Sequence, residues 1–477
     1  MRRMKSLAFL WIWMVMVSVV VADVRLPKTL TSYAVLQRDV PVKVWGWADS
    51  GEKVTVAFNG QTVETTAGED GKWCVTLQPM AAKSEGSDLV VTGKNKLTLS
   101  DVVVGEVWIC SGQSNMEWRL GSQSGTEEEC NGNYRFIRFN RDGYVVNETP
   151  QEELTGNGWV ACENGNQKQC TAVGFHFALA LYEKLNVPIG LIHCNWGGSR
   201  IESWMPEDCW EMLKEKGISR DEVAKSMSTR KEGHTVVGGM YNAKLAPWRN
   251  YAVRGAIWYQ GCSNGGESLT YYEKQKAMIA SWRKIWGDIP FYWVQLANYT
   301  APSENPNERL GWGPLRDAQT KCLEVAKTGQ AVTIDIGEEK DIHPRNKYDV
   351  GRRLAAWALA NDYGFDVPFA SPLFQSVKCD GAKAIVTFNH AGNGLVVGKQ
   401  EPRKFSLSDA PLYGFAIAGA DKKYFRATAK IVGKDTVELT CEAVPEPKFV
   451  RYAWQQNPAG CNLYNAEGFP ATPFTTE

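Results

Sequence analysis

The stretch Glu106-Val-Trp-Ile-Cys-Ser-Gly-Gln-Ser-Asn-Met-Glu-Trp118 decides the fold. Its first five residues are a short apolar run typical of a buried strand, and Gly112 indicates a turn where the strand ends. Ser114 follows in that turn, so its hydroxyl is expected to point into a cleft beyond the strand. Capping a following helix is the other role that a serine here can take. This loop alone does not distinguish the two roles.

Strands alternate with helices from about residue 105 to residue 364. The predicted strands cover 106–110, 189–194, 255–259, 291–296 and 331–336, and the predicted helices cover 173–185, 271–285, 315–326 and 349–360. Repeated βα units predict an α/β fold in which a mostly parallel sheet carries helices on both faces. Sites in such folds form in the loops beyond the carboxyl ends of the strands.

All-β regions flank this α/β region. Residues 23–104 alternate short β-type runs with turns, and β-type alternation returns over 365–477. We expect a β-sandwich-like N-terminal region and a C-terminal β region that packs against it. Residues 207–240 are polar and helix-prone, and we interpret them as an insertion.

Residues 1–22 have the pattern of a secretory signal peptide. A basic start precedes an apolar run from Leu7 to Val21, and small residues lead to a cleavage point after Ala22. The run is too short to favour a spanning helix. We therefore expect an exported protein with no membrane association after cleavage, periplasmic or extracellular in a bacterium and secretory or lysosomal in a eukaryote.

The composition excludes several classes of function. The 477 residues include 53 Lys and Arg against 53 Asp and Glu, which leaves no overall basic footprint for nucleic acid. Only five His are present, and the HExxH and CxxC spacings are missing, so we expect no metal site and no cofactor. The 19 Trp include candidates for stacking on sugar rings, although most of them are expected in cores.

Two further loops follow predicted strands and offer hydrogen-bond donors. In Asn195-Trp-Gly-Gly-Ser-Arg-Ile-Glu-Ser-Trp204, the adjacent Gly197 and Gly198 let backbone N–H groups approach a ligand closely. In Trp258-Tyr-Gln-Gly-Cys-Ser-Asn264, Gln260 and Asn264 carry side-chain amides. Both kinds of donor can stabilise a developing oxyanion. Each loop taken alone is also compatible with an ordinary turn.

The fourth loop, Asp341-Ile-His-Pro344, precedes the last predicted helix. Two residues apart on an extended segment, Asp341 and His343 present their side chains on the same side. The carboxylate can then accept from His343 Nδ1, which leaves Nε2 to take a proton from Ser114. Alternatively, these side chains are simply solvated at a surface turn. Together, the four loops supply each part of an acyl-transfer site.

With these loops in this order, the sequence resembles the SGNH hydrolases, specifically the sialate O-acetylesterase family. The match Ser-Gly-Gln-Ser-Asn-Met at 111–116 is the most specific, and the runs 34–39 and 45–48 are similar to the family's β region. The resemblance spans roughly residues 30 to 465. It implies a flavodoxin-like parallel sheet and assigns residues 105–364 to an SGNH hydrolase catalytic domain.

The resemblance also implies roles for single residues. Ser114 is the implied nucleophile, His343 the general base, and Asp341 the residue that orients His343. The implied oxyanion hole combines the N–H groups of Ser114 and of Gly197 or Gly198 with the side-chain amide of Asn264. The residues expected to contact substrate are Gln113, Gln260 and Arg200.

One position departs from the family pattern. The family loop usually reads Gln-Gly-Glu-Ser-Asn, whereas this chain has Cys262 at the glutamate position. The departure puts loop support or substrate preference in doubt. It also makes Cys262 a competing candidate for the nucleophile, because a thiolate of low pKa can act as one.

We therefore expect a metal-independent serine esterase that removes O-acetyl groups from sialic acids through an acyl-enzyme. Its expected partner is the O-acetylated sugar, and no nucleic acid. One alternative is the same chemistry on another acetylated glycan, such as xylan. A second is a non-catalytic glycan-binding protein on a decayed esterase scaffold, against which the complete set of Ser, His and Asp argues.

Overall fold

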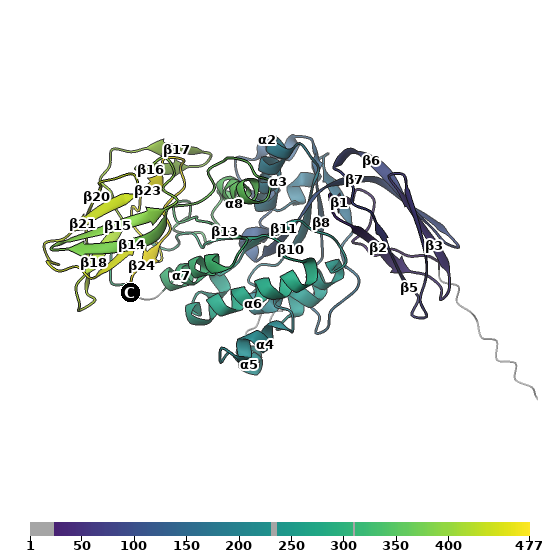
Figure 1. Ribbon diagram of the computed structural model, residues 1–477, viewed down its shortest axis with the longest axis horizontal. Helices are drawn as coiled ribbons and strands as arrows, with labels where there is room; N and C mark the ends of the chain where they lie inside the picture. The colour runs from purple at the N-terminus through teal and green to yellow at the C-terminus, as the bar shows by residue number, and fades with distance from the viewer. Residues whose placement is uncertain (1–22, 230–235, 309–310) are drawn as a thin grey trace, which may run out of the picture.

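The computed structural model describes residues 23–229, 236–308 and 311–477. Figure 1 shows a central α/β region between two all-β regions, with the N-terminal strands at one end of the long axis and the C-terminal strands at the other. The expected signal peptide lies outside the described residues. Within them, no helix is long and apolar enough to cross a membrane.

The central sheet confirms the predicted parallel, flavodoxin-like architecture. Its strand order is β13-β12-β11-β7-β10-β8-β9, and all its pairs are parallel except β8–β9. The strands are β7 (Lys96–Gly112), β8 (Tyr134–Arg141), β9 (Trp159–Cys162), β10 (Ile189–Asn195), β11 (Gly255–Tyr259), β12 (Phe291–Val294) and β13 (Thr328–Ala331). When β7, β10, β11, β12 and β13 are numbered one to five in chain order, their order across the sheet is 2-1-3-4-5. Ligands of such sheets bind where the strand order reverses, which is next to strand 1, here β7.

Helices cover both faces of this sheet, as predicted (Figure 1). On one face α3 packs along α8, and on the other α6 packs with α7 and α4. The helices are α1 (Ser114–Glu117), α2 (Glu127–Asn131), α3 (Ala172–Leu185), α4 (Cys209–Lys214), α5 (Arg220–Ser228), α6 (Ser268–Trp286), α7 (Gly313–Lys321) and α8 (Lys347–Asn361). The segment interpreted as an insertion, 207–240, contributes α4 and α5.

Three predicted elements are shorter or shifted in the structure. The strand expected over 291–296 is β12, which ends at Val294. The strand expected over 331–336 is β13, which ends at Ala331, because the following residues have already left the ladder with β12. The helix expected over 315–326 is α7, and a 3₁₀ turn replaces its last residues.

The N-terminal β region is built onto the central sheet. Its strands are β1 (Val35–Gln37), β2 (Val42–Trp47), β3 (Lys53–Phe58), β4 (Gln61–Thr66), β5 (Lys72–Leu77) and β6 (Lys83–Thr92). The 17-residue strand β7 pairs with β6 and β1 and then continues between β10 and β11. Glu106 on β7 is fully buried and binds Arg38 of the N-terminal region and Arg254 of the α/β region. One strand and one shared carboxylate therefore join the two regions.

The C-terminal β region has its own core, built around Val386, Ile417 and Val450. Its strands are β14 (Leu373–Asp380), β15 (Lys383–Asn389), β16 (Leu395–Glu401), β17 (Lys404–Leu407), β18 (Phe415–Ala418), β19 (Tyr424–Arg426), β20 (Thr428–Ile431), β21 (Thr436–Thr440), β22 (Phe449–Tyr452), β23 (Leu463–Asn465) and β24 (Phe474–Thr475).

The expectation that the two β regions pack against each other is wrong. They lie at opposite ends of the α/β region (Figure 1), and the C-terminal region attaches instead to α7. Arg316 of α7 is fully buried and donates to the carbonyls of Gln455 and Gln456 at 2.9 and 2.8 Å. These bonds satisfy a buried guanidinium that hydrophobic patterning in the sequence does not reveal.

Candidate active site

The loops singled out in the sequence start side by side at the carboxyl edge of the sheet. Gly112, the last residue of β7, is paired with Asn195 of β10 and with Tyr259 of β11. Gly112 has a φ of +135°, and a Cβ there would lie 2.3 Å from the Tyr259 carbonyl oxygen. A residue with a side chain would therefore clash with β11. The glycine lets the chain leave β7 at the point where the strand order reverses.

Ser114, His343 and Asp341 meet beyond this edge. The Ser114 hydroxyl lies 2.8 Å from His343 Nε2, across 229 residues of chain. The other ring nitrogen, Nδ1, lies 3.3 Å from Asp341 Oδ1, and the same oxygen accepts the backbone N–H of His343 at 2.8 Å. This geometry is that of a nucleophile, a base and a residue that orients the base.

The surroundings of His343 favour its neutral form. Trp118 stacks on the imidazole with ring centroids 5.4 Å apart. Partial burial and then the positive charge of Lys347 lower the pKa of His343, while Asp341 opposes the shift. A neutral imidazole can accept a proton, so the ring is ready to act as a base at neutral pH.

Gly197 packs directly on the serine. A Cβ at Gly197 would lie 3.3 Å from Ser114 Cβ, so the backbone of the glycine pair approaches the hydroxyl closely. The Gly197 N–H donates to Glu117 Oε2 at 2.7 Å. An oxyanion at this position therefore has to compete with Glu117 for that donor. Sequence patterns gave no indication of this carboxylate contact.

Gln113 ties the serine loop to the loop after β11. Its side-chain oxygen accepts the N–H groups of Gly261 and Ser263 at 3.1 and 3.4 Å. Ser263 in turn donates its hydroxyl to the Gly198 carbonyl at 2.9 Å. Gln113 is 3% exposed, so it braces three loops instead of facing a substrate.

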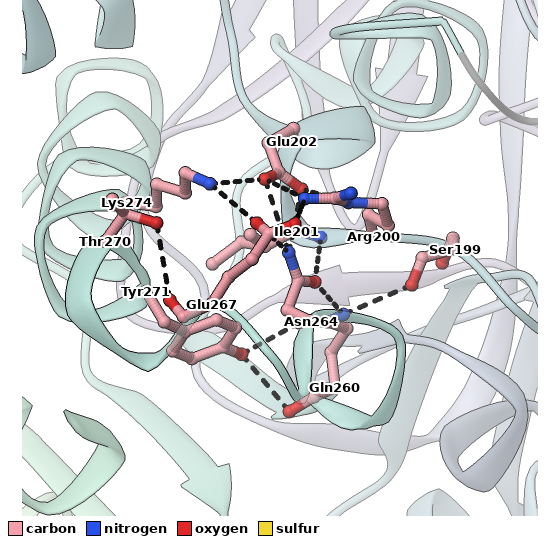
Figure 2. Close-up of polar contacts among 10 residues, drawn as sticks. All are labelled: Ser199, Arg200, Ile201, Glu202, Gln260, Asn264, Glu267, Thr270, Tyr271 and Lys274. Carbon is pink, nitrogen blue, oxygen red and sulfur yellow. Dashed lines mark hydrogen bonds and ion pairs between the residues drawn. The ribbon is translucent and has the colours of Figure 1, made fainter. Parts of the chain in front are cut away.

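Asn264 is held inside a buried network that Figure 2 shows. Its side-chain N–H₂ donates to Glu202 at 3.0 and 3.3 Å, and its side-chain oxygen accepts from the Ile201 N–H and from Gln260. Asn264 is 1% exposed. The amide expected to face the oxyanion is thus bonded to Glu202.

The other two expected substrate contacts belong to the same network. Arg200 is 4% exposed and binds Glu202 and Glu267. Gln260 is fully buried; its N–H₂ donates to Asn264 and Ser199, and its side-chain oxygen accepts from the Tyr271 hydroxyl. The structure does not place Arg200 or Gln260 where a sugar can reach them. Their hydrogen bonds instead hold the loops after β10 and β11 in place.

Glu202 is the centre of this network. It is fully buried and accepts from Lys274 at 2.6 Å as well as from Arg200 at 2.9 Å (Figure 2). Burial alone raises the pKa of Glu202, but the charges and hydrogen bonds of Lys274 and Arg200 outweigh it and lower the pKa to about 2. The carboxylate is therefore ionised and paired throughout the physiological range.

Cys262 is a poor nucleophile in this setting. Burial raises the pKa of its thiol to about 12, against the opposing charge of Lys347. At neutral pH the thiol is protonated, and the thiol form is weakly nucleophilic. Ser114 is accordingly the better candidate for the nucleophile.

Aromatic side chains form a rim beside the serine. Tyr144 is 51% exposed and meets the half-buried Trp196 edge to face, with centroids 5.0 Å apart. Arg141 donates to the Tyr144 hydroxyl at 3.0 Å. The Tyr144 hydroxyl donates to Glu117, and the Arg141 guanidinium lies 3.8 Å from the same carboxylate. Tyr144 and Arg141 come from a segment in which the sequence carried no recognisable motif.

In the part of the chain that the structure describes, no cluster of three or more His, Cys, Asp or Glu has the arrangement of a metal site. Ser114 and Asp341 each contact one ring nitrogen of His343.

The family profile for sialic acid-specific acetylesterases, a group of carbohydrate esterases, matches residues 104–360. The sialate O-acetylesterases of Mus musculus and Homo sapiens are 26% and 27% identical to this chain, over 95% and 94% of its length and 94% and 92% of theirs. The solved structure of a carbohydrate acetylesterase from Xanthomonas citri is 36% identical, with a TM-score of 0.84, and covers 95% of this chain and 99% of its own.

The matched region contains the whole Ser114 site, and the similarity to full-length relatives extends through both β regions. This chain belongs to the sialic acid-specific acetylesterase family of carbohydrate esterases, and it is a hydrolase of carboxylic esters.

Proposed function

We propose that this acetylesterase is an exported serine enzyme that removes O-acetyl groups from sialic acids. The observation that carries the serine mechanism is the 2.8 Å contact between Ser114 Oγ and His343 Nε2. The substrate is supported by relatives named sialate O-acetylesterases that align over nearly the whole chain.

In the first half of the reaction, Ser114 Oγ attacks the acetyl carbonyl carbon while His343 Nε2 takes its proton. The bond to the sugar oxygen then breaks, and His343 returns the proton to that oxygen. The acetyl group remains on Ser114. In the second half, water attacks the acyl-enzyme, His343 takes a proton from the water, and acetate leaves as Ser114 is reprotonated.

The oxyanion is stabilised by backbone donors at two loops. The N–H groups of Ser114 and of the Gly197–Gly198 pair are the candidates, since Gly197 packs on Ser114, and the Gly197 N–H has to leave Glu117 to take this role. Asn264 acts indirectly, because its contact with Ile201 positions the residues that follow the glycine pair.

The rim supports an anionic sugar as substrate. Tyr144 and Trp196 offer apolar faces for the ring. Arg141, which lies 3.8 Å from Glu117, offers a cation to the carboxylate that sialic acids carry and that xylan lacks. Acetate release from 9-O-acetylated sialic acid and from acetyl-xylan should be measured side by side with the wild type and with Arg141→Gln.

We expect the wild type to prefer the sialic acid, and Arg141→Gln to lose that preference by about tenfold, with the rate on acetyl-xylan unchanged. A wild type that prefers acetyl-xylan would favour the second candidate, an acetylesterase of another glycan, to which the similar carbohydrate acetylesterase also points. A purified protein that binds the sugars without releasing acetate would favour the binding protein.

Removal of divalent metals is expected to leave the reaction rate unchanged, because Ser114, His343 and Asp341 supply the nucleophile and the proton transfers. The measurement is hydrolysis of p-nitrophenyl acetate before and after prolonged dialysis against EDTA. Loss of activity that zinc restores would contradict the proposed mechanism.

A further inference from the structure

Lys347, the first residue of α8, is fully buried beside the catalytic loops. Its ammonium donates to the side-chain oxygen of Asn115 and lies 5.9 Å from the ring of Trp118 and 5.6 Å from that of Tyr259. Burying the ammonium of a lysine costs free energy of folding unless the charge is paired or has a function. In the described part of the chain its hydrogen bond goes to an amide and not to a carboxylate.

Asn115 connects this ammonium to both halves of the catalytic pair. It directly follows Ser114, and its side-chain N–H₂ donates to the carbonyl of Ile342 at 3.0 Å. Ile342 lies between Asp341 and His343. The two hydrogen bonds of Asn115, one from Lys347 and one to Ile342, therefore link the serine loop to the histidine loop.

Several charged or titratable groups surround Lys347. They are Cys262 from the loop after β11, Asp341 and Glu338 from the segment before α8, and His343. Burial lowers the pKa of Lys347 to about 7, and the negative charges of Asp341 and Glu338 oppose that shift. The Cys262 thiol is neutral at this pH, so it does not cancel the ammonium as a carboxylate at the same position would.

We propose that Lys347 is a positioning residue of the ester hydrolysis: through Asn115 it holds His343 against Ser114, and its ammonium keeps His343 neutral in acid. This inference rests on the proposed function, in which His343 is the base. The sign follows from electrostatics, because a nearby positive charge disfavours a second one on the imidazole.

Lys347 is charged below its pKa of about 7, and His343 takes up its proton within that same pH range. Removing the ammonium therefore raises the pKa of His343. The acid limb of the pH profile, where the base becomes protonated, moves to higher pH. Losing the link to Asn115 acts separately: it lets the two loops shift, which slows the reaction at every pH.

The test compares the kcat/KM pH profiles of four variants on p-nitrophenyl acetate. Lys347→Met should move the acid limb up by about one pH unit and lower kcat about 10- to 100-fold with KM little changed. Asn115→Leu should lower kcat and leave the limb in place. Cys262→Glu should move the limb up in the same direction as Lys347→Met, because the new carboxylate neutralises the ammonium. Lys276→Met, on the far surface of α6 and paired with Glu324, is the matched control and should match the wild type.

A second readout separates this inference from the proposed function. The rate at which a fluorophosphonate probe labels Ser114, followed by intact mass against pH, depends on the serine and its base but not on sugar recognition. If the wild type is never labelled at Ser114, the proposed mechanism fails. If it is labelled and the acid limb of Lys347→Met is that of the wild type, the role of Lys347 is overturned. Should Lys347→Met not fold, an unshifted limb in soluble Cys262→Glu overturns it equally.

Discussion

Replacement of Ser114 by alanine is expected to lower kcat for acetyl ester hydrolysis by at least about 10⁴-fold while the protein stays folded. Ser114 Oγ is the atom that His343 Nε2 contacts, and no other hydroxyl in the site has that contact among the described residues. The side chain is only partly buried and its loss leaves no large cavity. Hydrolysis of p-nitrophenyl acetate and the far-UV circular dichroism spectrum measure the two effects.

Ser111→Ala is the matched control for this variant. Ser111 lies three residues earlier, near the end of β7, is fully buried, and its hydroxyl has no hydrogen-bond partner in the described structure. The same chemical change there should leave the rate near that of the wild type. A folded Ser114→Ala protein that retains near-normal turnover, and loses it on alkylation of Cys262, would make the cysteine the nucleophile.

Replacement of Glu202 by alanine is expected to destabilise the fold by about 3 kcal/mol, because it leaves the buried cations Arg200 and Lys274 with only the partly exposed Glu267 as a shared partner. Removing one member of a buried charge network costs more than the network contributes as a whole, since the remaining charges stay out of water. Urea unfolding followed by tryptophan fluorescence measures the change in the free energy of unfolding.

Glu438→Ala provides the comparison for Glu202→Ala. Glu438 forms a 2.9 Å ion pair with Lys383 on the surface of the C-terminal region, where solvent screens it, so less than about 1 kcal/mol should be lost. Equal effects of the two substitutions would refute the argument from burial.

The pH dependence of stability gives an independent check on Glu202. Its pKa of about 2 in the folded protein lies below the value of about 4.3 expected for an unfolded chain. The stabilisation is therefore complete above about pH 4.3 and is lost as the pH falls towards 2. Wild-type stability should fall over this range more steeply than that of Glu202→Ala.

The sequence predicted the sheet because its signal is local. Apolar runs such as Gly255–Tyr259 identify buried strands, and the alternation with helices specifies parallel pairing. The place of the C-terminal β region could not be predicted in the same way. It depends on Arg316 and the carbonyls of Gln455 and Gln456, which lie 139 and 140 residues away in the chain and follow no periodic pattern.

The same distinction separates the site residues. Ser114 and His343 stand in short motifs whose spacing reflects their chemistry, and the structure brings them together. Asn264 also stands in a motif, but a motif does not state where an amide points, and the buried Glu202 captures it. Lys347 occupies a helical position where lysine is ordinarily solvated, so only the three-dimensional structure reveals its burial.

Strand β7 has a consequence for the modularity of this enzyme. Because its 17 residues serve the N-terminal sheet with one half and the catalytic sheet with the other, the two regions share a backbone ladder and a continuous apolar core. We expect them to unfold as one cooperative unit, in which local opening of the N-terminal sheet would remove hydrogen-bond partners from β7, the strand that leads into Ser114. A shortened enzyme that starts near residue 105 would begin inside that strand, so the N-terminal region is not a detachable accessory but half of the scaffold beneath the nucleophile.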